Sequence, residues 1–205
     1  MVLVLLVGLL PAAALAEPDA GPIPISEWDP DNPVELDSWE ALAEAMSQSG
    51  FYRLTQDLKL PTPVETGQAA LTVPEGVIIL LDLNGKKLDC DYGVADDTDT
   101  TFVAVEVHGL LGVGDTSDSV GGIEGADIGV HVIKDTEAPE DGGFLMYGGT
   151  VDASLRGIWV APGGNFGLFG GTVHSDSIGI DVREGGSVIV QGDSEIRGNT
   201  SASNN

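Results

Sequence analysis

The stretch that decides the fold is GIWV at residues 157–160, followed by FGLFGGTV at residues 166–173. A repeating unit of this size cannot bury its apolar face alone and has to stack on its neighbours. The repeat therefore predicts a chain that coils in layers. The same pattern occurs upstream at Gly129 with Phe144, and downstream at Gly179 with Val188.

Three sets of apolar positions align between the repeats. The first set consists of triplets in which two apolar residues flank a variable one. Successive triplets are separated by more residues than three hexapeptide repeats contain. Because side chains alternate along a strand, the outer residues of each triplet point inward and the middle residue points outward. The middle residues are, in chain order, Asp82, Glu106, His131, Trp159 and Asp181. Further sets begin at Leu111, Phe144, Phe166 and Val188, and at Ile123, Val151, Val173 and Ile196.

These alignments predict an all-β fold, namely a right-handed parallel β-helix (a solenoid) of about five coils. We expect it to span residues 51–199, with three short strands in each turn and glycine-rich turns between them. The acidic stretch from Lys134 to Gly142 is predicted to be a loop that bulges from one coil, and residues 200–205 are predicted to be a disordered tail.

A short amphipathic helix is predicted over residues 36–50. Asp37 is a candidate N-cap with Glu40 three residues later, and apolar residues recur at helical spacing until Gly50. The first layer of a stack of strands has to be covered against water. We therefore expect the helix to cap the stack through Trp39, Leu42 and Met46; an ordinary helix on the side of a globule is the alternative.

The N-terminal residues indicate export. Residues 1–16 form an aliphatic run followed by small residues that match a secretory cleavage site, although basic residues before the run are missing. The run is too short to span a bilayer, so we expect no transmembrane segment. Residues 17–35 are rich in proline and acidic residues and are predicted to be a linker. The expected location is secreted or at the cell surface.

The composition limits the partners of this chain. It carries 33 acidic and 8 basic residues, which argues against nucleic acid because phosphate binding needs a basic face. The acidity fits either solubility or binding of a divalent cation. Calcium is thus a possible cofactor, with weak candidate ligands at Asp96, Asp97 and Asp99. Cys90 is the only cysteine, and we expect it to be buried and inert because adjacent carboxylates raise a thiol pKa.

The entry into the repeats resembles a known family. The segments LTQDL at 54–58, ALTVP at 70–74 and LDLNGKKL at 81–88, with GGTV at 148 and 170, resemble exported bacterial right-handed parallel β-helix proteins of the pectate-lyase-like fold. The resemblance implies an adhesin-like surface or secreted protein that meets polysaccharide or a host surface. The fold hosts lyases, hydrolases and adhesins alike. The aspartates beside a Gly-His-Gly segment in polygalacturonases have no match, since His108 lacks the preceding glycine, and no catalytic residue is carried over.

The row of middle residues is the main candidate site. Equivalent positions on successive coils lie roughly 4.8 Å apart, which would place an exposed Trp159 between His131 and Asp181. An indole beside acids and an imidazole is able to hold a sugar ring by stacking. Asp82 and Glu106 would also meet the carboxyl spacing of a retaining glycosidase. The alternative is an ordinary solvated sheet face.

A second outward row contains Leu145, Tyr147, Phe169 and Gln191, with Tyr147 stacked on Phe169. An exposed aromatic row is usually covered, here either by residues 22–28 or by a partner. The last coil has no cap in the sequence. This predicts either continuation in a longer protein or association end to end.

Three functions follow from these observations. The first is a secreted or cell-surface scaffold that binds carbohydrate or a host-surface glycan. The second is a polysaccharide lyase or glycoside hydrolase that acts on an acidic polysaccharide. The third is a structural repeat segment of a larger adhesin without a ligand of its own.

Overall fold

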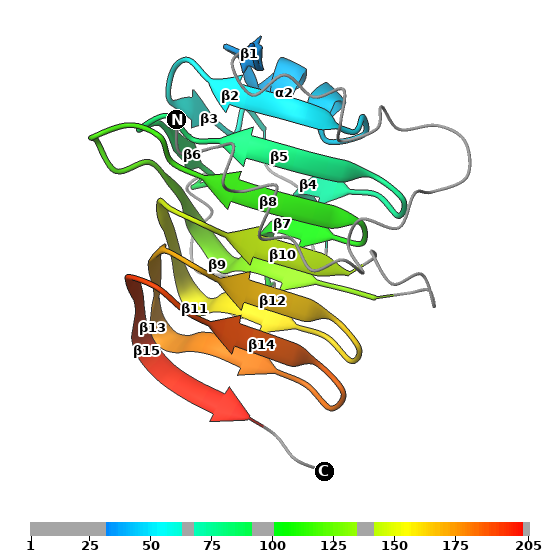
Figure 1. Cartoon of the computed structure of the whole chain (residues 1–205), viewed down its shortest axis with the longest axis vertical. Helices are drawn as coiled ribbons and strands as arrows, with labels where there is room; N and C mark the ends of the chain where they lie inside the picture. The colour runs from blue at the N-terminus through cyan, green and yellow to red at the C-terminus, as the bar shows by residue number, and fades with distance from the viewer. Residues whose placement is uncertain (1–31, 63–67, 92–100, 135–141, 203–205) are drawn as a thin grey trace.

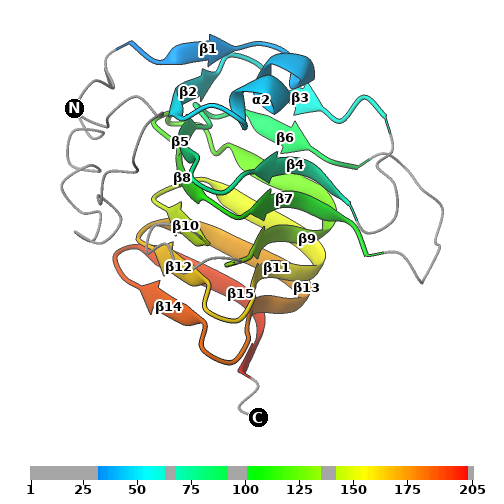
Figure 2. The same cartoon turned by 90° about the vertical axis from the view of Figure 1, so that its right-hand side faces the viewer.

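The computed structural model describes residues 32–62, 68–91, 101–134 and 142–202. This part of the chain is mostly parallel β-strands arranged in two sheets, with one short helix at one end (Figures 1 and 2). The predicted signal segment 1–16, most of the linker 17–35, the loop with Asp96, Asp97 and Asp99, and the bulge after Lys134 lie outside the described residues. Within the described ranges, no helix has the length and apolar character needed to cross a membrane.

Sheet A contains seven parallel strands in the order β1-β2-β5-β8-β10-β12-β14. All of them are short, and their inward residues lie in register from strand to strand; for example, Phe144 pairs with Phe166 and Leu111. The strands are β1 (Val34–Leu36), β2 (Gly50–Leu54), β5 (Ile78–Asp82), β8 (Leu110–Gly114), β10 (Gly143–Met146), β12 (Asn165–Leu168) and β14 (Ser187–Val190).

Sheet B follows the order β15-β13-β11-β9-β6-β3, and β7 pairs with both β4 and β9. Its later strands are long: one half of β9 pairs with β6 and the other half pairs with β7. The strands are β3 (Leu58–Lys59), β4 (Ala69–Val73), β6 (Lys87–Asp89), β7 (Val103–Val107), β9 (Gly122–Val132), β11 (Thr150–Val160), β13 (Gly171–Val182) and β15 (Ser194–Ala202).

These long strands change one prediction. Three separate strands per repeat were expected, but two of the three aligned sets, those of Val151 and Ile158, lie on the same strand β11. The pairing of β11 with β9 shifts register between these two residues, so the strand passes the irregularity without ending. From β9 onward each repeat therefore contributes one strand to sheet A and one to sheet B.

The core lies between the two sheets and consists of ladders of like residues. Ile158 pairs with Val130 and Ile180 in sheet B, and all three are buried. In sheet A, the rings of Phe144 and Phe166 stack with centroids 5.3 Å apart. Each fully buried aliphatic side chain contributes roughly 1.5–3 kcal/mol. The predicted inward orientation of the triplets in sheet B is thus confirmed.

Helix α2 (Trp39–Ala45) covers one end of the core. Trp39, Leu42 and Met46 are buried in the main core cluster, as predicted. The helix is shorter than expected, because β1 ends at Leu36 and β2 begins at Gly50. The predicted cap is also wrong: the hydroxyl of Ser38, not Asp37, accepts the hydrogen bond from the backbone N–H of Ala41, because Ser38 holds the extended conformation of an N-cap.

Candidate functional site

Four of the five predicted row residues lie side by side in sheet B. Glu106 on β7 pairs with His131 on β9, His131 pairs with Trp159 on β11, and Trp159 pairs with Asp181 on β13. We call these four residues the polar row. The fifth, Asp82, lies on β5 of sheet A, so its predicted place in the row is wrong. The strand neighbour of Glu106 on the other side is Thr72 of β4.

Asp82 has a structural environment instead. Its fully buried carboxylate accepts hydrogen bonds from Arg53 Nε at 2.8 Å, from Thr116 Oγ1 at 2.7 Å and from the backbone N–H groups of Thr116 and Asn84 at 3.0 Å. Burial alone would raise the pKa of Asp82, but the hydrogen bonds from Thr116, Arg53 and Asn84 outweigh it and hold this pKa below its ordinary value. Asp82 therefore fastens three successive layers of sheet A.

One end of the polar row is a cluster of one carboxylate and two imidazoles. Nε2 of His108 lies 2.8 Å from Oε1 of Glu106, and Nδ1 of His131 lies 3.6 Å from Oε2. The imidazole of His131, together with that of His108, holds the pKa of Glu106 below its ordinary value against the opposing effect of burial. Glu106 is therefore ionised near neutral pH and orients both rings.

Trp159 lies at the centre of the polar row but is half-buried, not exposed as predicted. The imidazole of His131 stacks on its indole with centroids 4.0 Å apart and an angle of 7° between the rings. The guanidinium carbons of Arg156 and Arg183 lie 5.0 and 5.9 Å from the indole centroid. With these three groups on the ring, stacking a sugar on the indole face is no longer the favoured contact.

The two arginines also hold the other end of the polar row. Nε of Arg156 and one terminal nitrogen of Arg183 donate hydrogen bonds to Oδ2 of Asp181, at 2.8 and 3.1 Å. The sequence analysis named His108 only as a departure from the polygalacturonase segment, and it did not single out Arg156 or Arg183. Two of them had a signal: His108 and Arg183 each follow a row residue by two positions, and residues two apart share one face of a strand.

Three polar atoms of the row are buried without a hydrogen-bond partner: Nε2 of His131, Nε1 of Trp159 and Oδ1 of Asp181. Buried polar atoms are nearly always paired, because leaving one unpaired costs about 1–3 kcal/mol. The indole N–H is a donor and the carboxylate oxygen is an acceptor; His131 Nε2 is an acceptor when Nδ1 carries the proton toward Glu106. On three neighbouring strands, the polar row thus contains an acceptor, a donor and an acceptor that have no hydrogen-bond partner.

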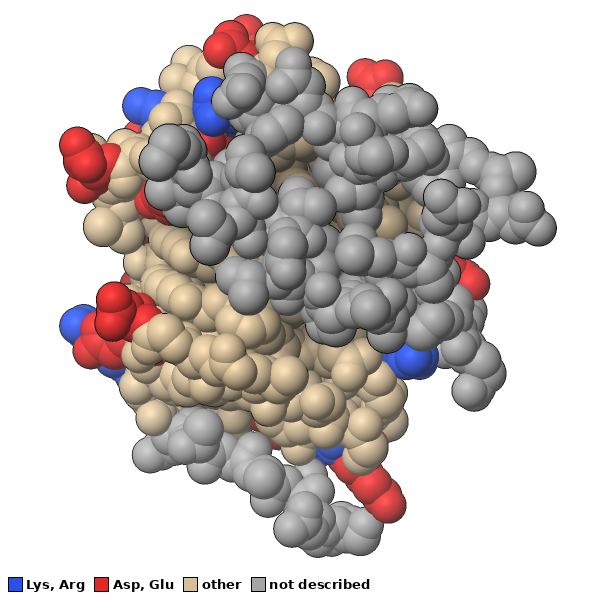
Figure 3. Space-filling model, viewed as in Figure 1, with Lys and Arg blue, Asp and Glu red and all other residues tan. Residues whose placement is uncertain are grey.

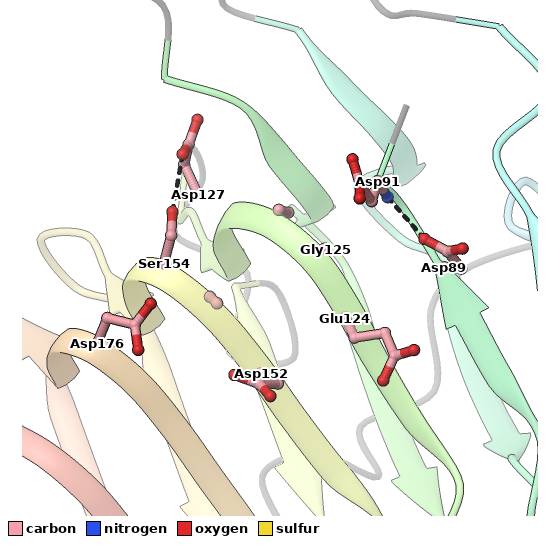
Figure 4. Close-up of a pocket in the computed structure, with 10 residues that line it drawn as sticks. Asp89, Asp91, Glu124, Gly125, Asp127, Asp152, Ser154 and Asp176 are labelled. Carbon is pink, nitrogen blue, oxygen red and sulfur yellow. Dashed lines mark hydrogen bonds between the residues drawn. The ribbon is translucent and has the colours of Figure 1, made fainter. Parts of the chain in front are cut away.

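A second region is a hollow of about 480 Å³ beside the bends of the sheet B strands (Figure 4). Several of its carboxylates already have partners: Lys59 lies 2.9 Å from Asp89, and Lys87 lies 2.8 Å from Glu124. Among the described residues, no three acidic, histidine or cysteine side chains are grouped to hold a metal ion. Six carboxylates line the hollow: Asp89, Asp91, Glu124, Asp127, Asp152 and Asp176.

This hollow was missed by the sequence analysis, although the alignment contained a signal. Glu124, Asp152, His174 and Arg197 each follow an aligned apolar residue of the third set. The backbone turns sharply at Gly125, whose φ is 86° and where a Cβ atom would lie 2.5 Å from the Asp91 backbone nitrogen. The side chains pair across strands: Nδ1 of His174 lies 2.7 Å from Oδ1 of Asp152. The hollow is therefore an acidic surface with its charges partly compensated.

The predicted aromatic row occurs on the outer face of sheet A. Tyr147 stacks on Phe169 with centroids 5.2 Å apart, and both pack against a small cluster of Ile78, Leu110 and Leu145. Burial raises the pKa of Tyr147 to about 12. Figure 3 shows that the described part of this face is largely free of charge, with acidic and basic side chains at its edges. Residues 22–28, one predicted cover, lie outside the described residues.

Cys90 is fully buried, as expected. Burial, assisted by the nearby carboxylates of Asp89 and Glu124, raises the pKa of the thiol to about 12. The thiolate needed for nucleophilic chemistry is therefore not formed near neutral pH.

Comparison with protein-family models, with curated proteins and with solved structures found no match for this chain. The site is therefore interpreted from its own geometry.

Proposed function

We propose that the chain is an exported right-handed parallel β-helix, similar to the pectate-lyase-like fold, that acts as a secreted or cell-surface scaffold for binding carbohydrate. Two features support the coil: from β9 onward the strands alternate between sheets A and B, and equivalent residues of successive repeats are strand neighbours. The signal-like residues 1–16 support export. An adhesin-like role toward polysaccharide or a host-surface glycan follows from this location.

The observation that carries the binding proposal is the set of three unpaired atoms on His131, Trp159 and Asp181. Sugar hydroxyls both donate and accept hydrogen bonds, so neighbouring hydroxyls on one glycan are able to satisfy an imidazole nitrogen, an indole N–H and a carboxylate oxygen. Because the indole face is already covered and the three atoms are buried, the ligand reaches the polar edges of these rings only when neighbouring side chains move aside. Arg156 and Arg183 fix the Asp181 carboxylate for this contact.

The spacing of the carboxylates does not favour glycoside hydrolysis. Asp82 and Glu106, the predicted pair, lie in different sheets. Glu106 and Asp181 remain in the row but are three strand spacings apart, roughly 14 Å, which exceeds the range of up to about 9.5 Å used by glycosidases. We therefore propose binding without hydrolysis at the polar row.

The test is a glycan array probed with the purified chain and with Trp159→Phe, which keeps the ring stack but removes the indole N–H. The matched control is Trp39→Phe, the same chemical change in the capping helix, outside the polar row. We expect Trp159→Phe to weaken glycan binding about tenfold, the effect of losing one hydrogen bond in a buried site. The control should bind as the unmodified chain does.

Two results would refute the proposal. Binding that is unaffected by Trp159→Phe and by Asp181→Asn would place the glycan elsewhere on the molecule. An absence of binding to every glycan tested would remove the carbohydrate site and favour a structural repeat segment. Circular dichroism of each variant verifies that the strand content is retained.

A further inference from the structure

The unpaired atoms of the polar row specify what a ligand has to supply. From β9 to β13 they are an acceptor on His131, a donor on Trp159 and an acceptor on Asp181. A ligand that pairs all three has to present two hydrogen-bond donors and one acceptor. An atom that stays unpaired keeps the full cost of its burial, so the row discriminates between ligands by the donors that they carry.

A ligand carboxylate lacks these donors. An ionised carboxylate only accepts hydrogen bonds, whereas a hydroxyl both donates and accepts them. An acidic sugar group at the row therefore pairs the indole N–H of Trp159 and leaves the acceptors of His131 and Asp181 unpaired. It also brings a second negative charge to the buried Oδ1 of Asp181, where the repulsion between like charges is poorly screened.

The two arginines beside the row do not reverse this preference. Nε of Arg156 and a terminal nitrogen of Arg183 both donate to Oδ2 of Asp181, at 2.8 and 3.1 Å. Arginine binds a carboxylate through paired donors, and each guanidinium already uses one donor on Asp181. The carboxylates of Glu106 and Asp181 balance the two guanidinium groups, so the row has no surplus positive charge to attract an anion.

Glu106 makes the demand for a donor stronger. Its two carboxylate oxygens lie 2.8 Å from Nε2 of His108 and 3.6 Å from Nδ1 of His131. The carboxylate therefore favours the form of His131 whose proton is on Nδ1, which leaves Nε2 as an acceptor. The ligand has to donate to that nitrogen. The chain as a whole adds to the negative surroundings, with 33 acidic and 8 basic residues.

We infer that the polar row selects uncharged glycans and rejects glycans whose sugars carry carboxylates, such as uronic acids. This inference rests on the proposed carbohydrate binding and adds the class of ligand to it. The hydroxyls of a neutral sugar donate to His131 and Asp181 and accept from Trp159. Specificity then comes from the acceptors and the charge that an acidic ligand leaves unpaired.

The test compares glycans that differ only in the carboxylate. Polygalacturonate, alginate and hyaluronan are each paired with their carboxyl-reduced form, in which the carboxylate has become a CH2OH group. Binding to the immobilised glycans is measured at about pH 8, where a histidine side chain is ordinarily neutral. We expect at least one reduced form to bind, with a Kd at least about tenfold lower than that of its acidic parent.

The same comparison at about 0.15 M and about 1 M salt separates the row from the charge of the whole chain. The formal net charge of -25 repels every acidic glycan, and high salt screens that long-range repulsion. Unpaired buried acceptors are not affected by salt in this way. The preference for the reduced form should therefore persist at about 1 M salt.

Two substitutions on β13 locate the preference. Asp181→Asn removes the buried charge and introduces an N–H donor, and it should reduce the preference at least about threefold. Asp176→Asn makes the same change at an exposed residue of the same strand and is the matched control, which should keep the preference in full. Circular dichroism verifies that each variant is folded. If Asp181→Asn does not fold, the paired glycans with the unmodified chain and Trp159→Phe still decide the question.

Equal affinity for a reduced glycan and its acidic parent overturns the inference. A preference that disappears at about 1 M salt, or that a folded Asp181→Asn protein retains in full, overturns it as well. If that binding is still weakened by Trp159→Phe, the carbohydrate site stands and only its class of ligand is wrong. Binding that Trp159→Phe leaves unchanged, or no binding to any glycan of the set, removes the site and this inference with it.

Discussion

Replacing Asp82 with alanine is expected to destabilise the fold strongly while leaving the polar row intact. The buried carboxylate of Asp82 receives a charged hydrogen bond from Arg53 on β2 and two hydrogen bonds from Thr116 after β8. A fourth comes from the backbone of Asn84, whose φ of 50° is unusual for a residue other than glycine. Alanine removes all four contacts and leaves the Arg53 guanidinium without its acidic partner.

The magnitude follows from these contacts. Removing one member of a buried ion pair costs about 3–5 kcal/mol, and the lower end applies here because Arg53 is partly exposed and regains water. Hydrogen bonds from Thr116 are also partly replaced by water, since that residue is exposed. We therefore expect a loss of about 3 kcal/mol in the free energy of unfolding, which lowers the melting temperature of a domain of this size by about 10 °C.

The dependence on pH gives a second readout. The pKa of Asp82 in the folded protein lies below its ordinary value of 3.8, so the carboxylate stabilises the fold above that pH. This contribution is lost as the pH falls through the folded pKa. The difference in stability between the unmodified chain and Asp82→Ala should be full near neutral pH and should shrink below about pH 4.

The assay is urea denaturation followed by circular dichroism, with the slope of unfolding free energy against urea required to stay the same in both proteins. Asp118→Ala, an exposed aspartate in the turn after β8, is the control and should change stability by less than about 0.5 kcal/mol. A loss below about 1 kcal/mol for Asp82→Ala would contradict the structural role. Unchanged stability together with loss of glycan binding would return Asp82 to the site.

Two further predictions concern packing and the thiol. Gly157→Ala should lower the free energy of unfolding by at least about 2 kcal/mol, because the new Cβ would lie 2.4 Å from Val173 Cγ1 and 2.6 Å from the Gly179 carbonyl oxygen. Gly114→Ala is the control and should be nearly neutral, because the space around its Cβ is open. Equal urea midpoints for the two variants would contradict this packing. Cys90, with a thiol pKa of about 12, should resist a thiol reagent at mildly alkaline pH in the folded protein and react fully in urea; rapid reaction without urea would show that it is not buried.

Local patterns were sufficient to predict the inward ladders and the capping helix. Ile158 and Ile180 each begin a triplet whose two apolar residues are two positions apart. Residues two apart lie on the same face of a strand, so each triplet presents one apolar face, which packs inward. The recurring GGTV segments put these strands in register, and the structure pairs Ile158 directly with Ile180. Trp39, Leu42 and Met46 share one helical face for the same local reason.

Local patterns were insufficient wherever two sheets offered the same motif. A triplet with two apolar residues around a variable one fits either sheet, so the spacing of 24 residues between Asp82 and Glu106 matched the later repeats by coincidence. The strand neighbour of Glu106 on the side away from His131 is Thr72 and not Asp82, because the early turns of the chain are longer. Likewise, Asp37 and Ser38 both fit a helix cap in sequence, and only the backbone conformation selects Ser38.

The sequence by itself determined which residues face the core, because the alternation of side chains along a strand is a local property of the backbone. Only the tertiary structure decided which outward residues meet. The contact of Arg53 with Asp82, and that of Arg156 with Asp181, joins residues from different strands, and the distance between strands along the chain depends on the loops. Loop length is not encoded in the period of the strands, so the aligned triplets predicted the row from Glu106 to Asp181, whereas the arginines beside it and the separate place of Asp82 became visible only when the layers were stacked.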